Sequence, residues 1–506
     1  MLGRSPLAFG AEQGRPTPDS GGAYFAPVFT VLGGVLMLFS LAMAVPTAFA
    51  WWGDDAALYS FVVSMGITFA AGFILLVATR RHRRELQARD GFLLVTLVWT
   101  VLPLFGALPI WLQLPGVSLT DAYFEAMSGL TTTGATVLTG LEALPTSVNV
   151  WRCFMVLVGG MGILVLAVAI LPMLGVGGSQ IFKAETPGPM KDEKLTPRIA
   201  ETARGLWGVY FLVALSCFSA YGWAGMSWTD AFMHMCSTLG LGGFAAYDAS
   251  FAAFNSWKIE LVAIFFMLMA GVNFALYFVA IKRCSLSVLW RDLEARVFWC
   301  LMLGSVLLIT TVLWLQGVYS DPLVTLRHAA FNVISVATTT GFATVDYAQW
   351  PIFAPIWMLF LCGFATCAGS TGGGIKLVRS LLLLKQARRE LTRILHPRAV
   401  QPVTLGSAVV GHEVMFAVLA FMLIYGAVTI GATMLLLLTG LDAISAFTAV
   451  VACINNTGPG LGQVGPAGNY QGLSDVQTWI CTITMLLGRL ELFSVLVLFT
   501  PQFWRK

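Results

Sequence analysis

The stretch SGLTTTGAT, residues 128–136, decides the fold, because three further segments can be aligned with it on a single glycine. These segments read STLGLGGFA at 237–245, SVATTTGFA at 335–343 and ACINNTGPG at 452–460. They recur about every 100 residues, and self-similarity at a near-regular spacing is the signature of a repeated structural unit. The sequence therefore predicts four copies of one unit.

The composition is typical of a membrane protein. Hydrophobic residues make up 58% of the chain, charged residues 11%, and the mean hydropathy is +0.81, which is far from the average of soluble domains. The net charge of +4 gives no indication of nucleic-acid binding. The nine cysteines lie mostly in apolar runs without framework spacing, so we expect them to be packing residues. Membrane lipid is the predicted surrounding.

Ten segments are apolar enough to cross a bilayer, which takes about 20 residues of helix. Basic clusters separate these segments in pairs, and the positive-inside rule places the clusters, with both chain termini, in the cytoplasm. The clusters are Arg80–Arg84, Lys183–Arg204, Lys282–Arg296, Lys376–Arg398 and Arg505 with Lys506. The predicted spans are 24–51, 57–79, 91–113, 154–178, 206–225, 260–281, 297–318, 352–384, 413–439 and 478–500.

The first span has a competing interpretation as a secretion signal. Arg4 and Arg15 precede an apolar run that ends in AFA at residues 48–50, a pattern similar to a signal-peptidase site. The run is much longer than the about 7–15 apolar residues of a signal peptide, which favours a retained span. Residues 1–20 are rich in Gly, Pro and polar side chains, and we expect a disordered cytoplasmic tail there.

Each repeat after residue 90 has a span, a short apolar segment, the glycine-bearing turn and a second span. The short segments cannot cross the bilayer, so we expect re-entrant helices. Asp121, Asp230, Asp442 and the Asp321-Pro322 pair are predicted to open them as helix-start residues. The predicted organisation is a tail (1–20), an N-terminal two-helix domain (21–89) and pore units at 90–180, 200–285, 296–390 and 410–506.

The four turns are predicted to form a selectivity filter for a monovalent cation. Irregular backbone at membrane depth must be buried in protein or line a cavity, so the turns are expected to converge on one axis. Glycine lets the backbone turn its carbonyls inward, and a ring of carbonyls can replace the hydration shell of an ion. The alternative is that small residues only allow close helix packing. The predicted filter residues are Thr132, Thr133, Gly134, Leu241, Gly242, Gly243, Thr339, Thr340, Gly341, Asn456, Thr457 and Gly458.

With these motifs the chain resembles the superfamily of K⁺ transporters that comprises the bacterial Trk and Ktr translocating subunits and the plant and fungal HKT and Trk proteins. The resemblance covers residues from about 90 to the C-terminus, and two extra N-terminal spans make the chain most similar to Trk-type (TrkH- and TrkG-like) subunits. Glycine in all four loops accompanies K⁺ selectivity in that superfamily, so Gly134 implies K⁺. The second loop departs from the pattern with Leu241-Gly242, and the fourth departs with Asn455-Asn456-Thr457 followed by Pro459.

The eighth span is predicted to break at CAGSTGGGIK, residues 367–376. Glycine costs helix stability by about 0.8–1.0 kcal/mol relative to alanine, and Gly372, Gly373 and Gly374 stand together. A nucleotide-binding loop is disfavoured because Ile375 separates the glycines from Lys376 and no strand precedes them. A flexible kink for packing is one alternative. The resemblance implies a mobile intramembrane loop that gates the pore, with Gly372–Gly374 and Lys376 in the gate.

Arg489 in the tenth span is the second candidate gate residue. An ionisable side chain at membrane depth is a functional hypothesis by default. The motif GRLE at 488–491 matches the arginine that family members carry just below the filter. The alternative is a structural pair between Arg489 and Glu491, although residues two apart do not share a helix face, so Glu491 can pair elsewhere.

Transport of K⁺ through the filter is therefore the predicted function. We expect an all-α polytopic membrane protein with four pseudo-symmetric units and two extra N-terminal helices. Each unit consists of a first span (M1), a short pore helix and a second span (M2). We expect no cofactor other than the transported K⁺, and no enzyme, because no catalytic or metal-binding set of residues is visible. The resemblance implies the bacterial inner membrane, a homodimer and a cytosolic TrkA-type nucleotide-binding regulatory subunit. The alternatives are a Na⁺-permeable or Na⁺/H⁺-coupled (symport) transporter on the same scaffold and, less favoured, a membrane-embedded enzyme or scaffold.

Overall fold

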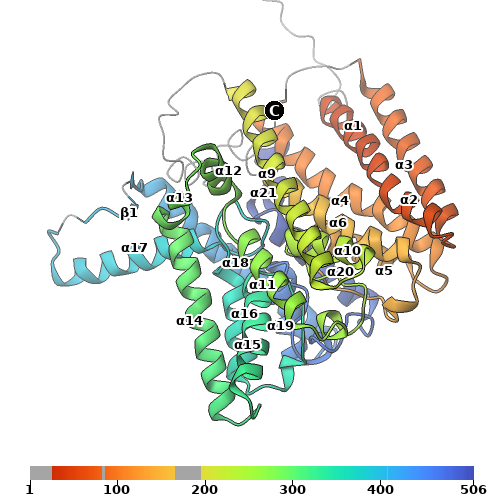
Figure 1. Cartoon of the computed structure of the whole chain (residues 1–506). Helices are drawn as coiled ribbons and strands as arrows, with labels where there is room; N and C mark the ends of the chain where they lie inside the picture. The colour runs from red at the N-terminus through yellow and green to blue at the C-terminus, as the bar shows by residue number, and fades with distance from the viewer. Residues whose placement is uncertain (1–24, 82–85, 166–194, 400, 407, 506) are drawn as a thin grey trace, which may run out of the picture.

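The computed structural model describes residues 25–81, 86–165, 195–399, 401–406 and 408–505. The predicted tail, the end of the fourth predicted span and most of the basic segment 183–204 lie outside these residues. The described residues form an all-α membrane-protein fold apart from one short antiparallel hairpin (Figure 1). In this hairpin β1 (Thr404–Leu405) pairs with β2 (Ala408–Val409), with Thr404 opposite Val409.

The two N-terminal spans pack against each other through glycine. They consist of α1 (Ala26–Ala42), which continues into α2 (Ala44–Trp52), and α3 (Leu58–Thr79). A Cβ on Gly33 would lie 2.8 Å from the carbonyl oxygen of Gly72, and a Cβ on Gly72 would lie 2.7 Å from that of Gly33. The backbones of α1 and α3 therefore touch, as small residues allow in membrane helices.

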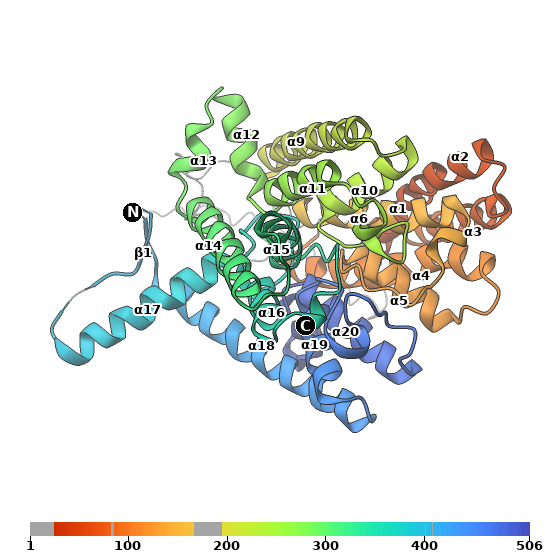
Figure 2. The ribbon, with the colours of Figure 1, turned by 60° about the horizontal axis from the view of Figure 1, so that its bottom comes forward.

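Four units follow, each with an M1 helix, a short pore helix and an M2 segment. The four pore helices gather near the centre of the molecule (Figure 2). The M1 helices are α4 (Ala88–Gln113), α9 (Leu195–Ala224), α14 (Leu293–Leu315) and α18 (His412–Leu438). The pore helices are α5 (Leu119–Leu130), α10 (Trp228–Gly240), α15 (Pro322–Ala337) and α19 (Ala443–Ile454). The M2 segments are α6 (Thr146–Val165), α11 with α12 (Trp257–Ala270, Phe274–Lys282), α16 with α17 (Phe353–Phe364, Leu377–Leu395) and α20 with α21 (Asp475–Arg489, Phe493–Leu496).

The remaining elements are short and lie between or after these helices. They are η1 (Leu141–Ala143), η3 (Ser250–Ala253), α13 (Ser287–Arg291), η4 (Tyr347–Gln349), η5 (Gly462–Val464), η6 (Val497–Phe499) and α22 (Pro501–Trp504). Large apolar side chains such as Leu38, Leu315 and Leu423 are more than half exposed on the outside of the bundle. Such a surface suits lipid, and the described residues form a multi-pass membrane protein.

The pore helices begin at two kinds of cap. Asp321 and Asp442 are N-caps, as predicted, and accept hydrogen bonds from the backbone N–H groups of Leu323 (2.8 Å) and Ser445 (3.0 Å). The backbone donors hold the pKa of Asp442 below its usual range. The prediction that Asp121 and Asp230 are N-caps is wrong, because α5 and α10 begin three residues earlier. There Ser118 and Ser227 accept from the backbone N–H groups of the two aspartates.

The ten predicted spans separate into unbroken and broken ones. Seven helices of the described residues are long and apolar enough to cross a membrane without interruption. The predicted break in the eighth span is confirmed between α16 and α17. Breaks in the sixth and tenth spans were not predicted: α11 and α12 meet at 89°, and α20 bends by 105° into the segment Phe493–Phe499. After the eighth break, α17 extends sideways from the body of the molecule (Figures 1 and 2).

Candidate functional site

All four pore helices end in the same turn. The residue two positions before each aligned glycine has a left-handed backbone, and the next N–H donates to the carbonyl five residues back. This is the Schellman ending of a helix, in which the left-handed position usually holds glycine. The left-handed residues are Thr132 (φ 56°), Leu241 (φ 53°), Thr339 (φ 63°) and Asn456 (φ 54°). The bonds are Thr133 to Ser128 (2.8 Å), Gly242 to Ser237 (3.0 Å), Thr340 to Ser335 (2.8 Å) and Thr457 to Ala452 (2.8 Å).

The four turns form a closed ring. We call Gly134, Gly243, Gly341 and Gly458 the glycine ring. A Cβ on any of these glycines would lie less than 3.0 Å from the backbone of the next turn, so every turn abuts its neighbour and the fourth abuts the first. The atoms met are, in order, Gly243 N, Thr340 O, Thr457 O and Thr133 O. Gly134, Gly341 and Gly458 also have left-handed φ angles of 81°, 87° and 91°.

Threonine hydroxyls brace the first and third turns in the same way. Thr131 and Thr133 join through their hydroxyls at 2.7 Å, and Thr338 and Thr340 join at 2.8 Å. Asn456 links the fourth turn to the neighbouring first turn, because its Nδ2 donates to the Thr133 hydroxyl at 3.0 Å. The twelve residues predicted to form the filter are thus brought together in one place.

The side chains of these turns are not equivalent. Leu241 is fully buried among core residues, so the second turn contributes only backbone to the ring. The buried hydroxyl oxygens of Thr132 and Thr457 have no hydrogen-bond partner in the described protein. On the side of the residues that follow the glycines lies a cavity of about 200 Å³, whose lining includes the whole glycine ring, Thr136 and Asp248.

The loop between α16 and α17, residues 365–376, lies against the other side of the ring. Its Gly373 N–H donates to the Thr339 hydroxyl at 3.0 Å, and its Thr371 hydroxyl donates to the Leu239 carbonyl at 2.9 Å. A Cβ on Gly373 would collide with the carbonyl of Asn455. This α16–α17 loop therefore contacts the C-terminal ends of the second, third and fourth pore helices.

A neighbouring break holds the far side of the α16–α17 loop. Cys367 N–H donates to the Gly271 carbonyl at 3.0 Å, and Phe274 N–H donates to the Gly369 carbonyl at 3.1 Å. Gly271 and Phe274 flank the break between α11 and α12. Within the loop, the Lys376 ammonium donates to the Gly372 carbonyl. Two breaks from different units thus pair through their backbones.

Arg489 also binds the α16–α17 loop. Its side chain is 2% exposed and donates to the Thr371 carbonyl and to the Gly159 carbonyl on α6, both at 3.0 Å. The alternative that Arg489 pairs with Glu491 is wrong, because Glu491 instead binds Arg379 at 2.5 Å. Glu491 has a left-handed backbone (φ 53°) just after α20 ends, which turns its side chain away from the helix.

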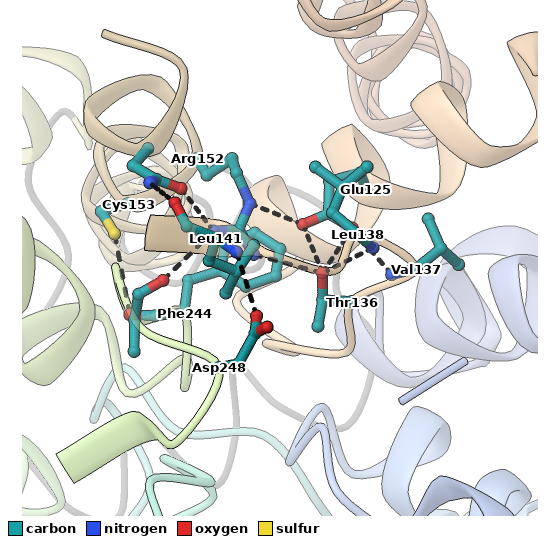
Figure 3. A network of polar contacts seen from close by, with 11 residues as sticks. Glu125, Thr136, Val137, Leu138, Leu141, Arg152, Cys153, Phe244 and Asp248 are labelled. Carbon is teal, nitrogen blue, oxygen red and sulfur yellow. Dashed lines mark hydrogen bonds and ion pairs between the residues drawn. The ribbon is translucent and has the colours of Figure 1, made fainter. Parts of the chain in front are cut away.

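Sequence reasoning missed Arg152, which lies behind the first two turns (Figure 3). It pairs with Glu125 on α5, and both side chains are fully buried. An arginine at membrane depth is the signal that singled out Arg489, but the predicted fourth span begins at residue 154, whereas α6 begins at Thr146 and so includes Arg152. No group of three or more His, Cys, Asp or Glu side chains that could hold a metal ion occurs among the residues that the structure describes.

Comparison with known proteins gives consistent matches over nearly the whole chain. The model of the TrkH family, described as a cation transport protein, matches residues 58–506. The chain is 46% identical to the Trk system potassium uptake protein TrkH of Salmonella typhimurium over 96% of its length and 100% of the relative. It is 38% identical to the potassium uptake protein TrkG of Escherichia coli, covering 94% of this chain and 97% of that protein. The crystal structure of the potassium transporter TrkH from Vibrio parahaemolyticus superposes with a TM-score of 0.89 at 41% identity, covering 95% of this chain and 100% of that one.

Proposed function

This chain belongs to the TrkH family of cation transport proteins, and from that premise we propose that it takes up K⁺ through the glycine ring. Its relatives are transporters, so the chain is a transport protein and not an enzyme. The relatives are named for potassium uptake, which supports K⁺ as the ion carried here.

The closed ring of four turns is the observation that carries the proposal. Carbonyl oxygens of Thr133, Thr340 and Thr457 each lie beside the glycine of an adjacent turn. Carbonyls in such a ring can replace the water around a dehydrated K⁺. The four pore helices also end at the ring, and the C-terminal end of a helix carries a partial negative charge that favours a cation. Selectivity then arises from the backbone carbonyls, while the side chains of the four turns set the shape of the ring.

We assign gating to the α16–α17 loop. The loop lies against three of the four pore-helix ends, so an ion that has crossed the ring meets it next. Arg489 holds the Thr371 carbonyl of this loop and adds a fixed positive charge beneath the ring. Ion passage requires the loop to move, with Gly372–Gly374 as the mobile part and the Lys376 and Arg489 contacts as its attachments.

The cellular setting follows from the basic clusters and from the family. We propose the bacterial inner membrane, with both termini in the cytoplasm, as the positive-inside rule indicates. We also propose a homodimer and a separate cytosolic TrkA-type nucleotide-binding subunit that drives the loop. The pore-unit boundaries 90–180, 200–285, 296–390 and 410–506, after the tail 1–20 and the two-helix domain 21–89, are part of the same proposal.

A second candidate is uptake that also admits or is coupled to Na⁺ or H⁺. The observation in its favour is the second turn, where Gly243 lacks the left-handed φ angle of the other three ring glycines and no threonine pair braces the backbone. An unevenly braced ring can adapt to a smaller ion more readily than a symmetric one. This candidate uses the same site and differs in the ion ratio.

The test is uptake of Rb⁺ and Na⁺ into proteoliposomes that contain the purified chain, alone and with a TrkA-type partner. We expect uptake of Rb⁺ over Na⁺, competition by K⁺, and a loss of this preference in Gly134→Ser, because a Cβ there meets the second turn. Equal uptake of Rb⁺ and Na⁺ by the unaltered chain would favour the second candidate. No uptake with the partner present, in vesicles that support a control transporter, would refute the proposed function.

A further inference from the structure

A buried ion pair holds the first turn behind the glycine ring. Arg152 Nε on α6 lies 2.7 Å from Glu125 Oε1 on α5, and neither side chain is exposed. The same carboxylate accepts from the Thr136 hydroxyl at 2.9 Å and from the Val137 N–H at 3.1 Å (Figure 3). Thr136 stands two residues after Gly134, in the backbone that leaves the first turn, which we call the exit of the turn. Glu125 therefore fixes this exit to α5, the pore helix that precedes the turn.

The guanidinium extends this contact to the second turn. Arg152 Nη1 donates to the Ala245 carbonyl at 3.1 Å, Nη2 donates to the Thr136 hydroxyl at 3.2 Å, and the Arg152 Cζ lies 4.4 Å from the centre of the Phe244 ring. Thr136 and Ala245 occupy equivalent positions, two residues after Gly134 and Gly243. One planar side chain with five donors thereby joins equivalent points of two neighbouring turns.

Of the other units, as far as the structure describes them, only the third makes an equivalent contact from the position of Glu125, and it does so with a neutral amide. The position of Glu125 holds His234, Asn332 and Ala449 in units two, three and four. Asn332 binds the exit of its own turn, accepting from the Thr344 N–H at 3.2 Å and donating to the Thr344 hydroxyl at 2.9 Å. His234 packs instead among phenylalanine rings, with Phe254 at 5.0 Å. Since a neutral amide suffices in unit three, the buried charges of unit one call for a further reason.

We propose that the Glu125–Arg152 pair is a specificity-determining positioning element that fixes the gap between the first and second turns. This inference deepens the proposed function and rests on it. The second turn lacks the threonine pair that braces turns one and three, so it depends on its neighbour for support. When the gap is fixed, the ring cannot contract around Na⁺, whose shell of ligands is smaller than that of K⁺. Releasing the pair lets the ring adapt and lowers the preference for the larger ion.

The experiment compares Glu125→Gln and Arg152→Gln with the unaltered chain in Rb⁺ and Na⁺ uptake by proteoliposomes. We expect the ratio of Rb⁺ to Na⁺ uptake to fall by about tenfold in both variants. The matched control is Glu260→Gln. Glu260 is also buried (3% exposed) and is bound to an arginine, Arg327, at 2.6 Å, but this pair links α11 to α15 and contacts none of the four turns. The control should leave the ratio unchanged.

Each single variant leaves one buried charge without its partner, which can prevent folding. The double variant Glu125→Gln with Arg152→Gln removes both charges and is measured in the same way, with the folded amount determined by size-exclusion chromatography. A purely structural role would lower Rb⁺ and Na⁺ uptake together, so an unchanged ratio in a folded double variant would overturn the inference. Absence of Rb⁺ uptake by the unaltered chain with a TrkA-type partner present would instead refute the proposed function.

Discussion

The glycine ring and the α16–α17 loop touch each other but are held by different kinds of contact. The ring is built from one backbone turn repeated four times, with each turn closed by the same pair of hydrogen bonds. The loop is held by single bonds to different elements, such as Thr371 to α10, Arg489 from α20 and Cys367 to Gly271. Repeated backbone contacts favour a rigid structure, whereas single contacts can break one at a time. The difference fits the proposed division of roles, in which the ring selects the ion and the loop controls its rate of passage.

The largest expected effect comes from a methyl group placed in the ring. Gly341→Ala puts a Cβ against the Thr457 carbonyl at a backbone angle that L-residues rarely adopt. We expect Rb⁺ uptake to fall by about 100-fold, equivalent to about 2.8 kcal/mol. The control is Gly304→Ala on α14, where a Cβ meets nothing within 4 Å, and this change should leave uptake intact. Normal uptake and ion ratio in Gly341→Ala would contradict the rigid-ring description.

A smaller effect, with a different signature, is expected from the main attachment of the loop. Arg489→Ala removes two hydrogen bonds and the positive charge below the ring. We expect Rb⁺ uptake to rise by about fivefold to tenfold, equivalent to about 1–1.4 kcal/mol, with the Rb⁺ to Na⁺ ratio unchanged. Arg489→Lys keeps the charge but cannot bind both carbonyls with the planar geometry of a guanidinium, so its Rb⁺ uptake should lie between that of the unaltered chain and that of Arg489→Ala.

Two outcomes would revise the role of Arg489. A changed ion ratio in Arg489→Ala would mean that the side chain belongs to the selective ring and not to the loop. Loss of folded protein in both the alanine and lysine variants would favour a structural role between α20, α6 and the loop.

The smallest expected effect comes from one hydroxyl of the loop. Thr371→Val keeps the shape of the side chain and removes its hydrogen bond to the Leu239 carbonyl. Such a hydrogen bond contributes about 1 kcal/mol. We expect a twofold to fivefold rise in uptake, equivalent to about 0.4–1 kcal/mol, again without a change in ion ratio. Thr310→Val on α14, where the hydroxyl binds only its own helix, is the matched control. A fall in uptake would show that this contact favours the open state of the loop.

The sequence predicts the repeat well because every unit needs the same glycine. The pore helices, their order and the break at Gly372–Gly374 all follow from short apolar segments, capping residues and clustered glycines. The start of α5 was misplaced because Ser118 caps the helix and Asp121 only supports it. The Schellman turns escaped notice because Thr132 and Leu241 occupy a position where glycine is usual.

Contacts between distant segments could not be predicted from a single sequence. Nothing in the spacing of the sequence connects Glu125 with Arg152, which lies beyond the turn on the next helix. Glu491 was open to several partners, and only the bend after Arg489 directs it to Arg379. The break between α11 and α12 had a weaker signal, a glycine at 271 and an asparagine cap at 273, within an otherwise apolar run.

The four turns of the ring are encoded separately on one chain. In a channel made of identical subunits every substitution in such a turn is applied around the whole pore at once. Here a single codon change alters one quadrant and leaves three intact, so natural variation can adjust ion preference in steps. The second turn already differs in this way, with Leu241 and Gly242 where the first and third turns have threonines.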